Sequence, residues 1–301
     1  MRAFAWFLGL IAVGLAAIAG FTYPAWWLLH PHFNFPFHRI GERIGMLALA
    51  LGFLLTARRL GLADRRSLGY DIPRRLFFRE MLIGLALGTT TMTGVVIIMG
   101  ALGLLDWSDT AGLTSGALTR LILTAAASGL AVAFIEETFL RGAMLTAIER
   151  ESGAATAVLL TALVYSATHF FASYKIPPAD VTAWSGLDLL AGTLHLFGHP
   201  LDIADAFSCL FAVGIVLGTI RVATGNIAAC IGLHAGWVWV MLVVHALSHP
   251  IRSAAASFLL SRFDGFIGWL VLAWTIVLGF ALNRFYAGAA GIASGASRSS
   301  R

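Results

Sequence analysis

Long apolar stretches separated by short polar connections dominate this sequence. A helix needs about 20 apolar residues to cross the hydrocarbon core of a membrane. Eight stretches approach this length, and their boundaries are soft by a few residues. The pattern predicts an all-α fold, a polytopic membrane helix bundle of about eight transmembrane helices: Phe4–Tyr23, Ile40–Ala57, Met81–Leu104, Leu118–Leu140, Ala155–Tyr174, Ala204–Ile220, Ile227–Leu247 and Phe266–Phe285.

The composition supports the membrane prediction and excludes other classes of protein. Of the 301 residues, 59% are hydrophobic and 12% are charged, whereas an ordinary soluble domain has roughly 25% charged residues. A water-soluble globular protein, a disordered chain and a disulfide scaffold are therefore excluded. Cys209 and Cys230 both lie in apolar runs and are interpreted as small buried hydrophobic residues.

The distribution of positive charge predicts the orientation of the bundle. The net charge is +5, from 20 basic and 15 acidic residues. With the N-terminus inside, 14 of the 20 basic residues lie in cytoplasmic segments and 6 lie on the opposite side. Basic residues are enriched in cytoplasmic loops, so we expect both termini in the cytoplasm. The charge is explained by membrane topology, and no nucleic-acid partner is expected.

Residues 1–287 are predicted to form a single transmembrane domain whose motif-bearing core is 118–247. The Gly/Ala/Ser-rich tail, 288–301, is predicted to be disordered. The first apolar segment is interpreted as a retained helix and not a cleaved signal peptide, because its apolar run continues to the aromatic pair Trp26 and Trp27.

Two connections have unusual compositions. Residues 61–80 carry five arginines around an apolar centre, which predicts an interfacial helix on an anionic membrane surface. Residues 175–203 combine two adjacent prolines with a mildly apolar stretch. This second connection is predicted to form a surface or re-entrant helix.

The fourth apolar segment contains two adjacent acids, Glu136 and Glu137, followed by Arg141. Ionisable groups inside a membrane are costly and usually mark a working site. Glu137 and Arg141 are four residues apart with the acid first, which is the favourable order for an ion pair on a helix. Glu136 points about 100° away from Glu137. We therefore expect Arg141 to hold Glu137 and Glu136 to face a cavity as a general base.

Two histidines occur in other apolar segments, His169 in the fifth and His234 in the seventh. Each is a weak signal alone. Together with Glu136 they predict a polar, water-containing pocket between three helices. Two chemistries remain open: the three residues bind a metal such as zinc with an open water position, or Glu136 takes a proton from water while a histidine steadies the oxyanion.

These residues resemble the motifs of the CPBP family, the CAAX-processing and bacteriocin-processing (abortive-infection) intramembrane proteases. The string of Glu136, Glu137 and Arg141 resembles the first motif. The string from Tyr165 to His169 resembles the second, with tyrosine where phenylalanine is usual. The third motif, His-x-x-x-Asn or Asp, matches at His234 and departs at Val238. Asn226 lies two turns before His234 and is a candidate substitute for the missing polar group, although it is at the wrong end of the helix.

The resemblance implies an intramembrane endopeptidase that cuts a membrane-associated peptide or protein. It implies that Glu136 activates water, that His169 assists it, and that His234 contributes to oxyanion stabilisation or to metal binding. Glu137, Arg141 and Tyr165 would support the site. The implied partners are membrane lipids and a peptide or membrane-protein substrate, in a bacterial inner membrane.

Two alternatives stay open from the sequence. One is a non-catalytic scaffold or immunity protein on the same fold, because Val238 replaces an expected polar residue. The other is a proton-coupled transporter, in which the acid and the histidines form a relay. The substrate, the need for a metal and the oligomeric state are not determined by the sequence.

Overall fold

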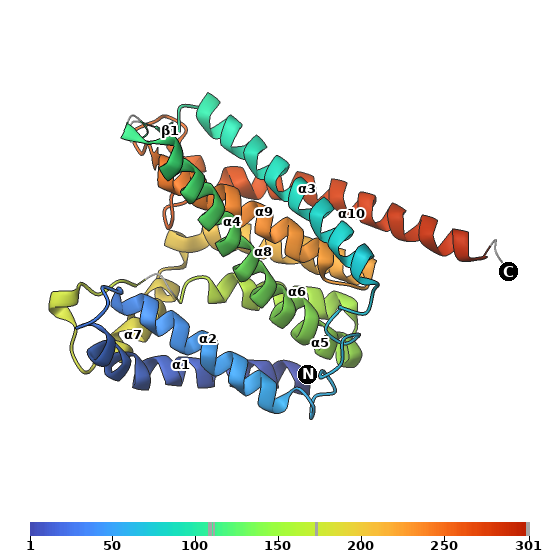
Figure 1. The fold of residues 1–301 in the computed structure, drawn as a ribbon, viewed down its shortest axis with the longest axis horizontal. Helices are drawn as coiled ribbons and strands as arrows, with labels where there is room; N and C mark the ends of the chain where they lie inside the picture. Colours follow the sequence, from blue (N-terminus) through green and yellow to red (C-terminus); the bar gives the residue numbers. More distant parts are fainter. Residues whose placement is uncertain (108–109, 111, 172–173, 299–301) are drawn as a thin grey trace.

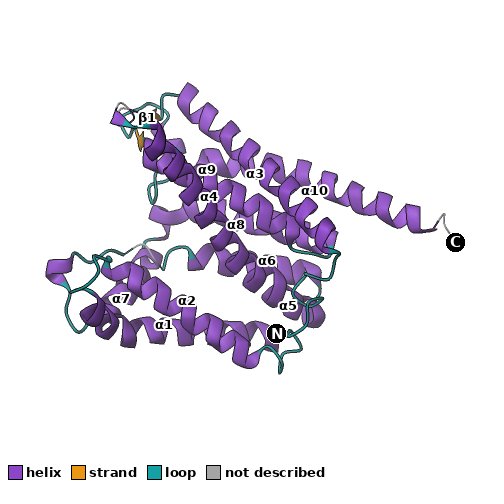
Figure 2. Ribbon diagram, viewed as in Figure 1, coloured by secondary structure: helices purple, strands orange, loops and turns teal. Residues whose placement is uncertain are grey.

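A computed structural model of the chain describes residues 1–107, 110, 112–171 and 174–298, the side chains of 283 and 287–298 aside. The described chain is almost entirely helical (Figures 1 and 2). The α-helices are α1 (Arg2–Leu29), α2 (Phe37–Thr56), α3 (Arg74–Ala101), α4 (Ser115–Glu137), α5 (Leu145–Ser152), α6 (Ala154–Thr168), α7 (Ser185–Gly198), α8 (Pro200–Thr224), α9 (Ala228–Leu247) and α10 (Trp269–Arg298).

Short elements connect these helices. A π-helical segment, η2 (Thr138–Met144), joins α4 to α5, so that Ser115–Ser152 forms one continuous helical rod. Two 3-10 turns, η3 (Pro178–Asp180) and η4 (Ser257–Leu259), lie in the longer loops. Strands β1 (Leu105–Asp106) and β2 (His249–Pro250) pair antiparallel at one end of the bundle.

The all-helical fold is confirmed, but the count of about eight transmembrane helices is not. Each of the eight predicted segments contains a helix, and six helical segments in the described part of the chain are long and apolar enough to cross a membrane. Helix α2 falls short because Arg39, Glu42 and Arg43 lie near its start. Helix α6 is apolar but has only 15 residues.

Helix α9 packs against both α3 and α4, and α8 packs against both α6 and α10. Helices α1 and α2 pair with each other on the opposite side of the bundle from α3 and α10 (Figure 1). One apolar core joins α3, α8, α9 and α10, and another joins α1, η2, α5, α6 and α8. Helix α8 contributes to both cores and so connects the two sides of the molecule.

Glycines allow an unusually close crossing of α3 and α9. A Cβ atom added to Gly232 would lie 1.9 Å from the carbonyl oxygen of Met81, and one added to Gly88 would lie 2.3 Å from that of Leu233. Small residues let membrane helices approach closely, so that van der Waals packing holds them together. This contact fixes the part of α9 that carries His234.

Three local predictions have different outcomes. The predicted interfacial helix at 61–80 is wrong as a separate element: its first half forms turns, and its second half is the start of α3, because the chain leaves Pro73 directly into a helix. The connection at 175–203 does contain a helix, α7, which packs against α1. Helix α10 continues to Arg298, into the tail predicted to be disordered. The division of the chain into domains stays a prediction.

Candidate active site

A stripe of small residues on α4 determines where its two acids point. Ala125, Gly129 and Ala133 are buried at four-residue spacing, and a Cβ atom on Gly129 would lie 2.9 Å from the carbonyl oxygen of Ala235 on α9. Glu137 continues this spacing and is therefore turned towards α9. Glu136 is one residue earlier, and its side chain is displaced by about 100° onto the flank of the helix.

Glu137 and Arg141 form an ion pair in the interior of the bundle. The Arg141 Nη1 atom lies 3.0 Å from the Glu137 Oε1 atom, and both side chains have 0% exposure. The predicted pairing is thus present. Arg141 belongs to the π-helical segment η2, a rare type of turn that is frequent at functional sites. The guanidinium also donates to the carbonyl oxygen of Gly214 at 3.4 Å and lies 4.6 Å from the ring centre of Tyr165.

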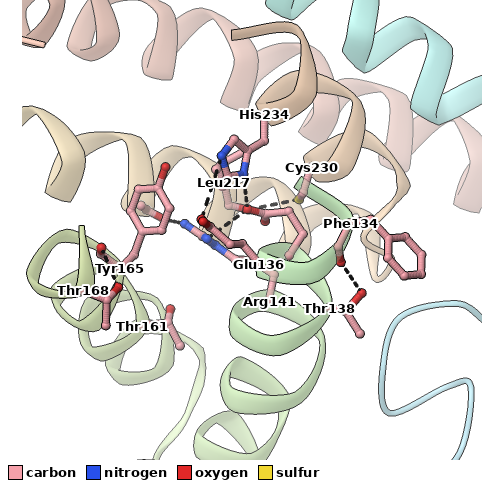
Figure 3. Close-up of polar contacts among 12 residues, drawn as sticks. Phe134, Glu136, Thr138, Arg141, Thr161, Tyr165, Thr168, Leu217, Cys230 and His234 are labelled. Carbon is pink, nitrogen blue, oxygen red and sulfur yellow. Dashed lines mark hydrogen bonds and ion pairs between the residues drawn. The ribbon is translucent and has the colours of Figure 1, made fainter. Parts of the chain in front are cut away.

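His234 contacts both acids through different ring nitrogens (Figure 3). Its Nδ1 atom lies 2.8 Å from the Glu137 Oε1 atom. An ionised carboxylate only accepts hydrogen bonds, so Nδ1 carries the proton that is donated to Glu137. This contact orients the ring and leaves Nε2 facing Glu136. The sequence did not predict that Glu137 would position His234.

Glu136 has the more open position of the two acids. Its side chain is 32% exposed, and its Oε2 atom lies 4.0 Å from the Nε2 atom of His234. The Oε2 atom itself is buried, and within the described chain it has no hydrogen-bond partner. An unpaired buried carboxylate oxygen is costly unless a water molecule or a substrate group satisfies it. Glu137 also has one unpartnered oxygen, but its side chain is fully buried, so Glu136 is the acid that a water molecule or a substrate can reach.

Tyr165 joins His169 to this group. Its buried ring contacts the ring of His169, with centroids 4.4 Å apart, and that of His234, with centroids 5.9 Å apart. The Nδ1 atom of His169 lies 2.7 Å from the carbonyl oxygen of Tyr165, which leaves the Nε2 atom free for another partner. The structure thus brings Glu136, Glu137, Arg141, Tyr165 and His234 together where α4, η2, α6 and α9 meet, and His169 joins this group through its contacts with Tyr165.

The three residues predicted as metal ligands do not form a ready ligand set. Among the residues that the structure describes, no group of three His, Cys, Asp or Glu side chains could hold a metal ion. A tetrahedral zinc site needs ligand atoms at about 2.0–2.2 Å from the ion. We therefore derive no catalytic step through zinc, and zinc dependence stays a prediction.

Asn226 does not replace the missing polar residue of the third motif. Its Oδ1 atom accepts a hydrogen bond from the backbone N–H of Ala228, and its Nδ2 atom donates to the carbonyl oxygen of Thr224. It thus holds the turn before α9, at the far end from the position it would have to fill. Val238, one turn after His234, is partly buried and adds no polar atom to the site.

Comparison with known protein families identifies a match to part of the chain. Residues 118–240 match the family model described as type II CAAX prenyl endopeptidase Rce1-like. No curated protein and no solved structure matches the chain. The matched region begins in α4 and ends in α9, and it contains Glu136, Glu137, Arg141, Tyr165, His169 and His234.

Proposed function

Through residues 118–240 the chain belongs to the CPBP family of membrane proteases, and on this premise we propose that it is an endopeptidase that uses Glu136 to activate water. One observation carries the proposal. The Glu136 Oε2 and His234 Nε2 atoms face each other at 4.0 Å. The other ring nitrogen of His234, Nδ1, is hydrogen-bonded to Glu137 of the fully buried Glu137–Arg141 pair.

The separation of these two atoms suits one water molecule. With a water oxygen about 2.8 Å from each atom, the angle at the water between Glu136 Oε2 and His234 Nε2 would be about 90°. This is near the angle between the two hydrogens of a water molecule that donates both of them. Because the Nδ1 proton of His234 is donated to Glu137, Nε2 of the neutral ring offers a lone pair. Glu136 and His234 would thus accept the two hydrogens, and the water lone pairs would face the substrate carbonyl.

The reaction then follows ordinary general acid–base chemistry. The water oxygen attacks the carbonyl carbon of the peptide bond as its proton moves to Glu136. The same carboxyl then gives that proton to the leaving nitrogen, the C–N bond breaks, and the products are a carboxylic acid and an amine, between which one proton passes to leave a carboxylate and an ammonium. We assign the developing oxyanion to His169, whose Nε2 atom donates when the ring is protonated.

We propose a prenylated peptide as the first substrate to test, from the description of the matching family model. The assay uses an internally quenched peptide that ends in a prenylated Cys-a-a-X sequence, with the protein in liposomes. Glu136→Gln and His234→Ala are expected to lower the rate of cleavage by about 10²- to 10⁴-fold, since each removes a group that accepts a hydrogen of the attacking water. His169→Ala is expected to do the same if it binds the oxyanion.

Glu42→Gln is the matched control, because it makes the same chemical change in α2, where Glu42 pairs with Arg39 near the surface. Thermal unfolding of each variant separates lost chemistry from lost folding. Mass spectrometry of new protein termini in cells that express the wild type or Glu136→Gln provides a substrate-independent test. Normal cleavage by a folded Glu136→Gln variant would refute the proposal.

A chelator distinguishes the two chemistries. We expect full activity after chelation, because we assign the activation of water to Glu136. Loss of activity that returns on adding zinc would select the metal route. The non-catalytic scaffold and the transporter are not favoured by the family match.

We propose a bacterial inner membrane as the location, with both termini in the cytoplasm. The excess of basic residues in the segments assigned to the cytoplasm supports this orientation. Labelling of single introduced cysteines from each side of sealed vesicles tests it, and modification of a terminal cysteine from the outer side would overturn it.

A further inference from the structure

The loop between α2 and α3 is hydrogen-bonded to α5, the last part of the helical rod Ser115–Ser152 that also carries Glu136 and Glu137. Arg150, on α5, donates to the carbonyl oxygen of Gly61 at 2.9 Å and to the hydroxyl of Ser67 at 2.7 Å. Asp64 accepts hydrogen bonds from both the backbone N–H and the hydroxyl of Ser67. These bonds give the loop a fixed path up to the three residues 68–70.

Tyr70 reaches the turn of helix that carries both acids. Its hydroxyl lies 2.6 Å from the Thr138 Oγ1 atom, and the Thr138 hydroxyl donates to the carbonyl oxygen of Phe134 at 2.6 Å. Threonine has one hydroxyl hydrogen, so Tyr70 is the donor to Thr138. Burial raises the pKa of Tyr70, which keeps this hydroxyl protonated. The bond from Thr138 to Phe134 (Figure 3) spans the turn of the helix in which Glu136 and Glu137 lie, and Tyr70 extends this bond by donating to Thr138.

The two residues before Tyr70 contact the segments next to the site, which are the start of α9 and the π-helical segment η2. The carbonyl oxygen of Gly69 accepts a hydrogen bond from the N–H of Ile227, the residue that precedes α9. The backbone of Leu68 lies against Gly142 in η2, where an added Cβ atom would come within 2.9 Å of the Leu68 carbonyl oxygen. Gly69 has φ +78°, so a side chain at this position would strain the turn.

We propose that residues 68–70 form a clamp that fixes the separation of Glu136 and His234, with Tyr70 as a positioning residue. The clamp holds the acid-bearing turn through Thr138 and the beginning of the histidine-bearing helix through Ile227. Its effect on catalysis rests on the proposed function. Its effect on the structure does not, because the contacts join the two helices whatever the chemistry is.

The first experiment measures the clamp without any substrate. Hydrogen–deuterium exchange is followed in the peptide that contains residues 134–140, with the full chain in lipid nanodiscs. Tyr70→Phe removes the hydroxyl and keeps the ring contacts with Phe77 and Phe134. We expect faster exchange in this peptide and no change with Tyr23→Phe, which makes the same substitution on α1. Unchanged exchange in Tyr70→Phe would overturn the clamp.

The second experiment measures cleavage of the prenylated, internally quenched peptide. Tyr70→Phe and Thr138→Val are each expected to lower kcat by about tenfold or more, with KM little changed, because small displacements of reacting groups are costly. Thr138→Ser keeps the hydroxyl and is expected to restore kcat. The double variant Tyr70→Phe/Thr138→Val should lose no more than Thr138→Val alone, since the Tyr70 hydroxyl acts through Thr138.

The outcomes separate the clamp from the proposed function. Faster exchange and reduced kcat support both. Faster exchange in Tyr70→Phe with cleavage that survives in Glu136→Gln keeps the clamp and refutes the proposed function. A kcat that is unchanged in Tyr70→Phe, while Glu136→Gln is inactive, overturns the positioning role and leaves the proposed function standing.

Discussion

The buried pair of Glu137 and Arg141 predicts a large and specific loss of stability when either charge is left alone. Both side chains have 0% exposure, and their charged atoms are 3.0 Å apart. Breaking a buried ion pair by removing one partner costs about 3–5 kcal/mol. Arg141→Met leaves the buried Glu137 carboxylate with the His234 N–H as its hydrogen-bond donor and no cation beside it, and Glu137→Gln leaves a buried guanidinium beside Gly214 and Tyr165.

The double variant Glu137→Gln/Arg141→Met removes both charges and keeps an oxygen that accepts from His234. We expect its free energy of unfolding to lie within about 1 kcal/mol of the wild type, because neutral replacements of a buried pair are often tolerated. Each single variant should lower the unfolding midpoint by roughly 5–10 °C. Thermal unfolding of the four proteins in one detergent gives the coupling between the two residues.

The exposed pair of Arg39 and Glu42 provides the control for this cycle. Its charged atoms are also 3.0 Å apart, but the arginine side chain is 58% exposed. Exposed pairs contribute about 0–1 kcal/mol. If the cycle at Glu137 and Arg141 gives no more coupling than the cycle at Arg39 and Glu42, the buried charge pair described here is refuted.

Three further predictions concern other parts of the molecule. Gly232→Ala should destabilise the protein because its Cβ atom would overlap the backbone of α3, whereas Gly9→Ala, with no atom within 4 Å, should be neutral or slightly stabilising in the same unfolding assay. Hydrogen bonds from Ser67 hold the pKa of Asp64 below its ordinary value. Their contribution is present above the ordinary pKa and is lost as pH falls through the lowered one, so amide exchange in the 61–73 loop should rise below about pH 4, and not in Asp64→Asn. Val238→Asn adds an amide one turn after His234 and should raise kcat by about tenfold or more if it donates to the oxyanion; an unchanged kcat would argue against that role.

The sequence predicted the helical fold and the ion pair because both follow from local patterns. Apolar runs of membrane-spanning length give helices, and the four-residue spacing of Glu137 and Arg141 places their charges together. The number of transmembrane helices could not be fixed in the same way. Helix α2 has three charges near its start, and α6 ends at Thr168, six residues before the predicted end of its segment.

The contacts between distant segments could not be predicted from one sequence. His234 and Glu137 are 97 residues apart, and Tyr70 and Thr138 are 68 apart. Nothing in the composition of the arginine-rich connection indicates that Tyr70 would reach the acid-bearing turn. Asn226 was predicted from its distance along the helix alone, and its amide instead bonds to the turn around it.

The π-helical segment has a consequence for insertions and deletions in this chain. Such a segment holds a residue more than the regular turns it replaces. Deleting Phe139 or Leu140 from this segment would shorten the spacing between Glu137 and Arg141 from four residues to three. In a regular helix this change would move Arg141 by about 100° around the axis relative to Glu137 and away from its present contacts with Gly214 and Tyr165, although both charged groups are retained. We therefore expect this stretch to tolerate a change of side chain far better than a change of length.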